Sequence, residues 1–466
     1  MAIKIPFDNS YTRLPDQMYS HQVPEPVSNP SLIIWNAELA TQLGITQDTE
    51  SDLAQVFSGN IIPNGATPIA QAYAGHQFGH WNPQLGDGRA VLLGEVNGPA
   101  GRFDLQLKGS GRTPYSRNGD GRAWLGPVLR EYLMSEAMFA LSVPTTRALA
   151  AVATGDRVQR EIGYPGGIVT RIAASHIRIG TFQYFAARNE LVALRALYDH
   201  VIERHYPDAT SPSDLLKQIM TRQAQLIAGW MSVGFIHGVM NTDNAQIAGE
   251  TIDYGPCAFM DDYHAMQVFS SIDQRGRYAY GNQPRIAVWN IAQLATALIP
   301  LMPDQDRAIE DFTEIVNGFP AIYETEWRKR FAAKLGIAPS EASDQLAQDL
   351  LALMDKDAAD FTNVFANLGR DTDRDQFIDR AVFDAWRVRW MDQVPNLDQM
   401  RITNPIVVPR LHQIEAVIQA AVEGDYTPFH TLLSVVTHPF DRSDLADGFT
   451  QPPVPSEVVS RTFCGT

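Results

Sequence analysis

Oxygen-bearing side chains near the middle of the chain have the types and spacing that a metal–phosphate site needs. Asn244 is followed nine residues later by Asp253, which opens an Asp-Tyr-Gly triplet. Mg²⁺ is a hard cation that binds carboxylate, amide and phosphate oxygens. A hairpin over residues 245–252 would bring the two side chains together. The spacing therefore predicts that Asn244 and Asp253 hold a divalent metal beside a phosphate.

The same segment matches the catalytic-loop pattern of kinase-type phosphotransferases, in which H-x-D-x-x-x-x-N follows a helix. His237 and Asn244 occupy the first and last positions of that pattern. Val239 stands where kinases have the base that orients a hydroxyl, so ordinary kinase chemistry is not expected. Asp243 is the nearest carboxylate that could replace this base. Chance occurrence of short motifs is the alternative interpretation.

A lysine at the end of a predicted strand argues against chance. Polar and apolar residues alternate from Phe103 to Lys108, so Lys108 shares a polar face with Asp104 and Gln106 while the opposite face packs in the core. Glycines and arginines recur in the following loop, residues 109–122. Because glycines let backbone N–H groups approach an anion, this loop could bind phosphate. A flexible surface loop is the alternative.

A helix is predicted from about Leu125 to Leu141, with Pro127 in its first turn and an apolar face. Glu131 and Glu136 both border apolar residues of this helix, so periodicity allows either to face inward. Kinases pair a strand lysine with an inward helix glutamate, which positions the lysine for phosphate binding. An ordinary surface salt bridge is the alternative interpretation.

The order of predicted elements indicates an α+β protein with a cleft between two lobes. An arm rich in Pro and Asn, residues 1–65, precedes a strand-rich lobe over residues 66–180 that would bind a nucleotide. A helical lobe over residues 181–305 contains the catalytic segment. A mostly helical extension over residues 306–466 ends the chain. This is the order of a bilobal, protein-kinase-like fold with extensions at both termini.

Composition favours a globular cytoplasmic protein. The 466 residues include 53 Asp and Glu against 37 Lys and Arg, a net charge of -16, which argues against a nucleic-acid partner. The first residues lack a signal-peptide pattern, and no apolar stretch predicts a transmembrane helix, so we expect no membrane partner. Only Cys257 and Cys464 are present, which excludes a disulfide scaffold and agrees with a reducing compartment.

Longer motifs are more specific than these short signatures. They are Asn9-Ser10-Tyr11, Tyr73-Ala74-Gly75-His76-Gln77-Phe78-Gly79, Gln84-Leu85-Gly86-Asp87-Gly88-Arg89, Gln106-Leu107-Lys108-Gly109-Ser110-Gly111, Arg130-Glu131-Tyr132, Thr170-Arg171-Ile172-Ala173, and the segment from His237 to Asn244 with Asp253-Tyr254-Gly255. With these motifs, nearly the whole chain resembles the selenoprotein O family of pseudokinase-fold protein adenylyltransferases, in its bacterial, cysteine-containing form.

The resemblance implies that AMP passes from ATP to a Ser, Thr or Tyr hydroxyl of a protein substrate. ATP would lie reversed relative to kinases, so that its α-phosphate faces the hydroxyl and pyrophosphate leaves. Asp243 would be the proton acceptor, and Mg²⁺ or Mn²⁺ would bind Asn244 and Asp253. With manganese, UMP transfer from UTP is also implied.

The resemblance also selects residues that the sequence pattern left open. Lys108 would pair with Glu131. The implied nucleotide-binding residues are Gly86, Gly88, Arg89, Lys108, Asp120, Gly121, Arg171, Arg178 and Asp253. From the residues alone, Arg171 could instead form a structural ion pair, and the glycines could serve turns.

The two cysteines suggest redox control of the tail. Cys464 matches the place of selenocysteine in some relatives, and Cys257 follows Asp253 by four residues. We hypothesise a reversible disulfide between Cys257 and Cys464 that holds the tail over the site; a buried, inert Cys257 is the alternative. Two other functions stay open for the chain, namely transfer of the γ-phosphate of ATP and non-catalytic binding of ATP by a scaffold.

Overall fold

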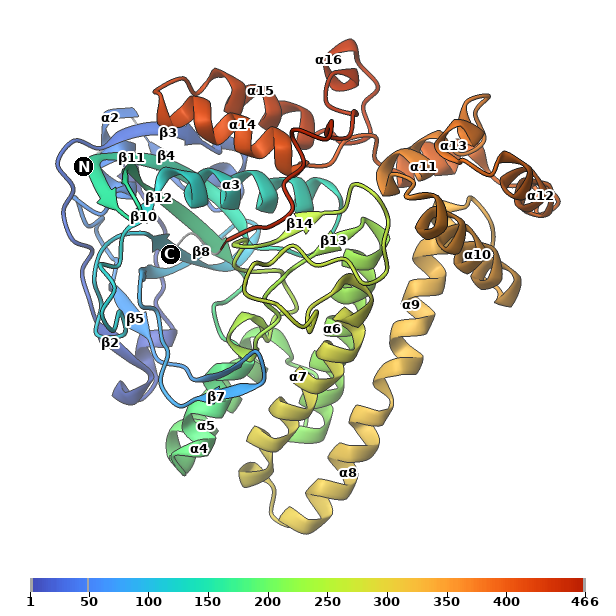
Figure 1. Cartoon of the computed structure of the whole chain (residues 1–466). Coiled ribbons are helices and arrows are strands. Elements are labelled where there is room, and N and C mark those ends of the chain that lie inside the picture. Colours follow the sequence, from blue (N-terminus) through green and yellow to red (C-terminus); the bar gives the residue numbers. More distant parts are fainter. Residues whose placement is uncertain (1–2, 48–49, 464–466) are drawn as a thin grey trace.

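A strand-rich region followed by helices makes up the computed structural model, which describes residues 3–47 and 50–463 (Figure 1). The main sheet has the strand order β2-β5-β8-β9-β12-β11-β3, and β10 pairs with β12. Its strands are β2 Tyr19–His21, β3 Ser31–Trp35, β5 Ile69–Gln71, β8 Ala90–Gly98, β9 Gly101–Lys108, β10 Ala123–Trp124, β11 Arg147–Gln159 and β12 Gly163–Ala173. The predicted order of a strand-rich part before a helical part is confirmed.

The two faces of the sheet contact different helices. Helix α3 (Leu125–Ala140) packs on one face, and α1 (Ala37–Gln42) and α2 (Glu50–Phe57) contribute to a separate apolar cluster on the other. Leu105 and Leu107 of β9 belong to that second cluster. The polar side chains of β9 therefore face the α3 side, as the alternation of the strand predicted.

Residues 1–65 do not form an arm that only wraps the protein. Strands β2 and β3 lie at the two edges of the main sheet, and β3 pairs antiparallel with β11. Helix α2 was not predicted. The segment Ser31–Trp35 is apolar and contains two isoleucines, which favours a strand, whereas β2 is too short to leave a pattern.

The helical part begins close to the predicted boundary at residue 180, because β12 ends at Ala173 and α4 starts at Ile179. Helices α6, α7, α8 and α9 lie side by side (Figure 1). The bounds are α4 Ile179–Ala187, α5 Leu191–His205, α6 Pro212–Ser232, α7 Gln283–Leu298, α8 Gln305–Asn317 and α9 Phe319–Lys334. Among the described residues, no helix combines the length and apolarity needed to cross a bilayer.

The predicted hairpin over residues 245–252 is wrong. This segment pairs instead with distant backbone, through bridges from Gln246 to Arg178 and from Thr251 to Thr145. The strands that bring its two ends together are β13 (Phe235–Ile236) and β14 (Ala258–Phe259), which pair antiparallel outside it. Backbone groups of the segment bond instead to neighbouring elements: the Ile247 N–H donates to the Ile177 oxygen and the Thr251 N–H to the Pro144 oxygen.

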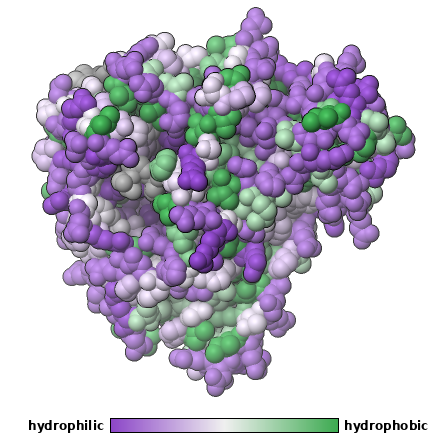
Figure 2. Space-filling model, viewed as in Figure 1, coloured by the Kyte–Doolittle hydropathy of each residue, from purple (hydrophilic) through white to green (hydrophobic). Residues whose placement is uncertain are grey.

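The C-terminal extension contacts both regions of the protein. One group of helices lies beyond the end of α9, whereas α14 and α15 return to pack on α3 (Figure 1). Hydrophilic residues cover most of this face of the molecule (Figure 2). The bounds are α10 Glu341–Asp357, α11 Phe361–Asn367, α12 Arg380–Met391, α13 Leu397–Thr403, α14 Leu411–Val422, α15 Thr427–Val436 and α16 Asp444–Asp447.

One buried arginine joins the segments of this extension. Arg410 precedes α14 and is 1% exposed. Its guanidinium donates to Asp360 at 2.7 and 3.1 Å, to Asp261, and to the backbone oxygen of Thr450 at 3.1 Å. Arg410 thus connects the start of α11, the segment after β14 and the C-terminal tail.

We expect Arg410→Met to lower the free energy of unfolding by ~3–5 kcal/mol, because it leaves two carboxylates without their buried cation. Urea denaturation followed by circular dichroism measures this loss. The matched control is Arg401→Ala, since Arg401 and its partner Asp398 are both exposed and such pairs contribute at most ~1 kcal/mol. Equal losses for the two variants would contradict the structural role of Arg410.

Candidate functional site

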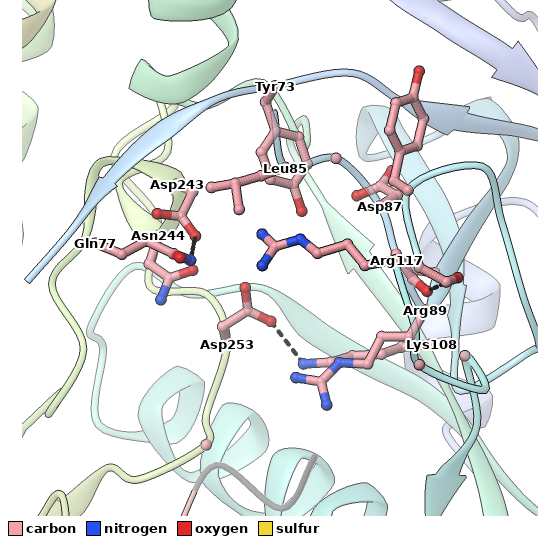
Figure 3. A pocket seen from close by; sticks show the side chains of 18 of the residues that line it. Tyr73, Gln77, Leu85, Asp87, Arg89, Lys108, Arg117, Asp243, Asn244 and Asp253 are labelled. Atoms are coloured by element: carbon pink, nitrogen blue, oxygen red, sulfur yellow. Dashed lines mark hydrogen bonds and ion pairs between the residues drawn. The ribbon is translucent and has the colours of Figure 1, made fainter. Parts of the chain in front are cut away.

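A pocket of about 760 Å³ opens between the main sheet and the helical part, which is large enough for a nucleotide. It brings together all the residues predicted to contact the nucleotide, the metal or the hydroxyl, and Figure 3 shows several of them converging on one space. These residues are Gly86, Gly88, Arg89, Lys108, Asp120, Gly121, Arg171, Arg178, Asp243, Asn244 and Asp253.

A cluster of two cations and two carboxylates forms one wall of this pocket; Glu131 and Arg171 are buried, and Lys108 and Asp253 are partly exposed. The Lys108 ammonium lies 2.6 Å from Glu131 and 2.6 Å from Asp253. Arg171 donates to the same two carboxylates, at 2.7 and 2.6 Å. Each carboxylate therefore binds both cations, and the cluster joins β9, α3, β12 and the segment after Ile252.

The structure shows which of the two glutamates of α3, Glu131 or Glu136, pairs with Lys108. Glu131 faces the pocket side and binds Lys108, whereas Glu136 receives hydrogen bonds from Arg147 at 2.9 and 2.7 Å. Both carboxylates are buried and paired. The choice therefore depends on which cation lies opposite each residue, a fact that the helix pattern does not contain.

Asp253 is held as an anion in an unusual backbone conformation. Burial would raise the pKa of its carboxyl, but Lys108 and Arg171 hold that pKa well below its usual value. Its φ angle of 63° lies in the left-handed region, which costs a residue other than glycine on the order of 1 kcal/mol or more. The two ion pairs fix this conformation and direct the carboxylate into the pocket.

A third cation, Arg178, is buried and links the cluster to the segment of residues 237–244 that contains Asp243. Arg178 precedes α4, and its guanidinium lies 3.6 Å from Asp87 and 3.7 Å from Asp253. It also donates to the backbone oxygen of Asp243 at 3.0 Å and lies 4.3 Å from the centre of the Tyr73 ring. None of these contacts is a tight ion pair, so Arg178 can bind an additional anion.

The pocket is positive although the protein is acidic. Its lining contains eight cationic side chains against four carboxylates, while the whole chain has a net charge of -16. The cations are Arg89, Lys108, Arg112, Arg117, Arg122, Arg160, Arg171 and Arg178, and the carboxylates are Asp87, Asp120, Asp243 and Asp253. A polyanion such as a triphosphate fits this charge distribution.

Glycines let two loops form the other wall. A Cβ on Gly86 would lie 2.4 Å from the Tyr115 ring, and one on Gly121 would lie 2.0 Å from the backbone oxygen of Gly111. Both glycines have positive φ angles, 105° and 67°. A larger residue at position 86 would therefore push apart the loops that contain residues 85–89 and 111–122, and one at position 121 would distort the second loop itself.

Asp243 lies apart from the cation cluster, in a short 3-10 helix over Thr242–Asn244 (Figure 3). Its Oδ2 accepts a hydrogen bond from the Gln77 amide at 3.1 Å. Burial raises the pKa of its carboxyl to about 6, and the hydrogen bond from Gln77 and the charge of Arg178 oppose that rise. Asp243 is thus a carboxylate at neutral pH that accepts a proton more readily than an exposed aspartate.

Asn244 and Asp253 suit a hard divalent cation. The Asn244 amide nitrogen donates to the backbone oxygen of Val239 at 3.0 Å, which leaves its oxygen available as a ligand. The residues described by the structure contain no group of three or more His, Cys, Asp or Glu arranged to hold a metal. Mg²⁺ or Mn²⁺ bound here would therefore take further ligands from phosphate oxygens and water.

Sequence reasoning did not assign roles to Gln77 or Asp87, although both lie in the longer motifs. Gln77 reaches Asp243 because strands β6 (Gly75–Gln77) and β7 (His80–Asn82) fold onto the catalytic segment. Asp87 accepts hydrogen bonds from the Gln71 backbone at 3.0 Å and from Gln106 at 3.3 Å. Neither contact has a local sequence signal, because each partner is distant along the chain.

Cys257 is buried, and burial raises the pKa of its thiol to about 12. The adjacent residue Pro256 accepts a hydrogen bond from the Thr462 hydroxyl at 2.6 Å, and the Thr462 N–H donates to Phe269 at 2.7 Å. The C-terminal tail therefore passes directly beside Cys257. Cys464 lies outside the described residues.

Known proteins resemble this chain over its whole length. The family model for protein adenylyltransferase SelO matches residues 1–437. Protein nucleotidyltransferase YdiU of Ruegeria sp. (strain TM1040) is 57% identical over 473 residues, and that of Ruegeria pomeroyi is 58% identical over 473 residues; both alignments cover 100% of each chain. The relative of the same name from Agrobacterium fabrum is 53% identical over 484 residues, with 99% of each chain covered. The resemblance seen in the motifs is confirmed, and the chain belongs to the SelO family.

Proposed function

We propose that this protein transfers AMP from ATP to the hydroxyl of a Ser, Thr or Tyr side chain on another protein. The observation that carries this proposal is the separation of charge within the pocket. Lys108 and Arg171 provide a cationic end, and Arg178 lies between them and the backbone oxygen of Asp243, while the Asp243 side chain forms no ion pair among the described residues. A triphosphate whose β- and γ-phosphates bind the cations would turn its α-phosphate toward Asp243.

Two features of the pocket support a kinase-like fold, although the proposed reaction differs from that of kinases. A strand lysine pairs with a helix glutamate, and Asn244 and Asp253 flank the phosphate-binding region. The kinase base is absent, because Val239 lines the pocket at its position. Transfer of the γ-phosphate remains the second candidate, favoured by the metal-binding pair and opposed by Val239.

In the proposed reaction, Asp243 accepts the proton of the hydroxyl. The hydroxyl oxygen bonds to the α-phosphorus, the bond from that phosphorus to the bridging oxygen breaks, and pyrophosphate leaves. Lys108, Arg171 and Arg178 offset the charge of the leaving group. Asn244 and Asp253 would hold a divalent metal, whose positive charge would polarise phosphate oxygens. Because these contacts concern phosphates and not the base, we extend the proposal to UMP transfer from UTP with manganese.

Labelled ATP distinguishes the candidate functions. With Mg²⁺ and a protein acceptor, we expect protein-bound label from α-³²P-ATP and none from γ-³²P-ATP. Asp253→Ala should abolish the signal, because it removes a metal ligand and a partner of Lys108. Label from the γ position alone would establish a kinase despite Val239, and ATP binding without transfer of either label would favour the scaffold.

The variant Asp243→Asn tests two properties of Asp243. One is its role as the base, and the other is the loss of protein stability caused by its buried charge. We expect transfer to fall ~10²–10⁴-fold, the range typical of a general base, while ATP binding is retained. Because the folded pKa of about 6 lies above that of an unfolded aspartate, ionisation of Asp243 destabilises the protein progressively from pH 4 to pH 7. The variant should therefore be more stable than wild type at pH 8, by up to ~3 kcal/mol, and equally stable near pH 4.

Thermal melting at the two pH values, with calorimetry for ATP binding, measures these effects. An Asp243→Asn variant that melts below wild type at pH 8 would contradict the buried-charge assignment. Retained transfer at wild-type rate would exclude Asp243 as the base, whatever the melting temperature shows.

We also propose that Cys257 and Cys464 form a reversible disulfide that restrains the tail. The contact between Thr462 and Pro256 supports it, since it brings the tail to the residue next to Cys257. Under mild oxidant, mass spectrometry of the non-reduced protein should find a peptide that links the two cysteines, and Cys257→Ser should lack it. Intact wild-type protein with no such peptide under these conditions would exclude the disulfide.

A further inference from the structure

The hairpin of β6 and β7 lies directly on the catalytic segment. Each of three consecutive hairpin residues contacts one of three consecutive residues of that segment. The contacts are from the His76 N–H to the Thr242 hydroxyl at 2.7 Å, from the Gln77 amide to Asp243 Oδ2 at 3.1 Å, and from the Phe78 N–H to the Asn241 side-chain oxygen at 3.0 Å. Gln77 and Asp243 also line the nucleotide pocket.

The hairpin is anchored to the helical part rather than to the main sheet. Its His76 ring contacts the Trp289 ring of α7 with centroids 5.1 Å apart, and His76 Nδ1 lies 3.0 Å from the Gln183 amide of α4. Ala74, just before β6, donates to the backbone oxygen of Gly180 at 3.0 Å. These contacts hold Gln77 at a fixed place relative to the segment that contains Asp243.

The two oxygens of Asp243 have different surroundings. Oδ1 is buried and has no hydrogen-bond partner among the residues that the structure describes. A Cβ on Gly75 would lie 2.8 Å from this atom, so the hairpin backbone closes that side. Oδ2 accepts the hydrogen bond from Gln77 and keeps a second lone pair. Of the two oxygens, Oδ2 is therefore the one that an incoming hydroxyl can reach.

We propose that Gln77 is a positioning residue, whose amide orients Oδ2 of Asp243 toward the pocket and stabilises the carboxylate that accepts the hydroxyl proton. The inference rests on the proposed function, because it takes Asp243 as the base. In the reaction, the proton passes to Oδ2 as the hydroxyl oxygen bonds to the α-phosphorus and pyrophosphate departs. Gln77 donates its hydrogen bond throughout and exchanges no proton.

The test compares kcat and KM of AMP transfer at a single pH for wild type, Gln77→Ala and Gln77→Glu. Removing the donor should lower kcat by about tenfold or more, the cost of losing a hydrogen bond to a charged group. Gln77→Glu keeps the shape of the side chain but replaces the donor by a like charge, so its kcat should fall further. The KM for ATP should stay within about twofold of wild type. In the Asp243→Asn background, Gln77→Ala should cause no further loss, because the two residues act as one unit.

Gln84→Ala is the matched control, since Gln84 is exposed and lies outside the pocket lining. It should keep the wild-type kcat and KM. Melting temperature and ATP binding confirm that each variant is folded. If Gln77→Ala unfolds, the isosteric variant Gln77→Glu can still be measured.

A purely structural role would lower kcat by the same factor in the Asp243→Asn background as in wild type, which would overturn the inference. Active wild type together with wild-type kcat in both Gln77 variants would overturn the role of Gln77 alone. Wild type that transfers no nucleotide overturns the proposed function, and this inference with it.

Discussion

The cluster of Lys108, Glu131, Arg171 and Asp253 is the interaction on which the rest of the site depends. Glu131 and Arg171 are buried, whereas the side chains of Lys108 and Asp253 are partly exposed. Taking charges out of water is expensive, and the cluster is stable because each carboxylate contacts both cations at 2.7 Å or less. Removing one member would leave a charge without its partner. The cluster therefore ties two strands of the sheet to α3 and to the segment that contains Asp253.

The carboxyl groups of Asp243 and Asp253 differ in pKa because their surroundings differ. Lys108 and Arg171 overcome the effect of burial on Asp253 and hold its pKa low, which suits a metal ligand that must stay ionised. At Asp243 burial prevails over the Gln77 hydrogen bond and the charge of Arg178, so the pKa rises to about 6, which suits a group that accepts a proton near neutral pH. One pocket thus contains two carboxyl groups whose pKa values are shifted in opposite directions.

The C-terminal extension acts on the site through α3. Arg130 and Tyr132 flank Glu131 on this helix, and they contact Glu415 of α14 and Phe429 of α15. The Tyr132 and Phe429 ring centroids lie 5.9 Å apart. Helices α14 and α15 therefore brace the helix that presents Glu131 to Lys108. The sequence of this extension shows no chemical motif, and its contribution is to hold a distant glutamate in place.

The sequence alone determined the elements whose signals are local. Alternation identified β9 and the polar face of Lys108, and apolar periodicity with Pro127 near the helix start identified α3. The tertiary structure decided the remainder, including Glu131 over Glu136, the absence of a hairpin over residues 245–252, and the contact of Gln77 with Asp243. That last contact joins residues 166 positions apart. Periodicity is a pattern among residues that are close in sequence. A contact between distant residues depends on how separate elements pack, so no local pattern could reveal it.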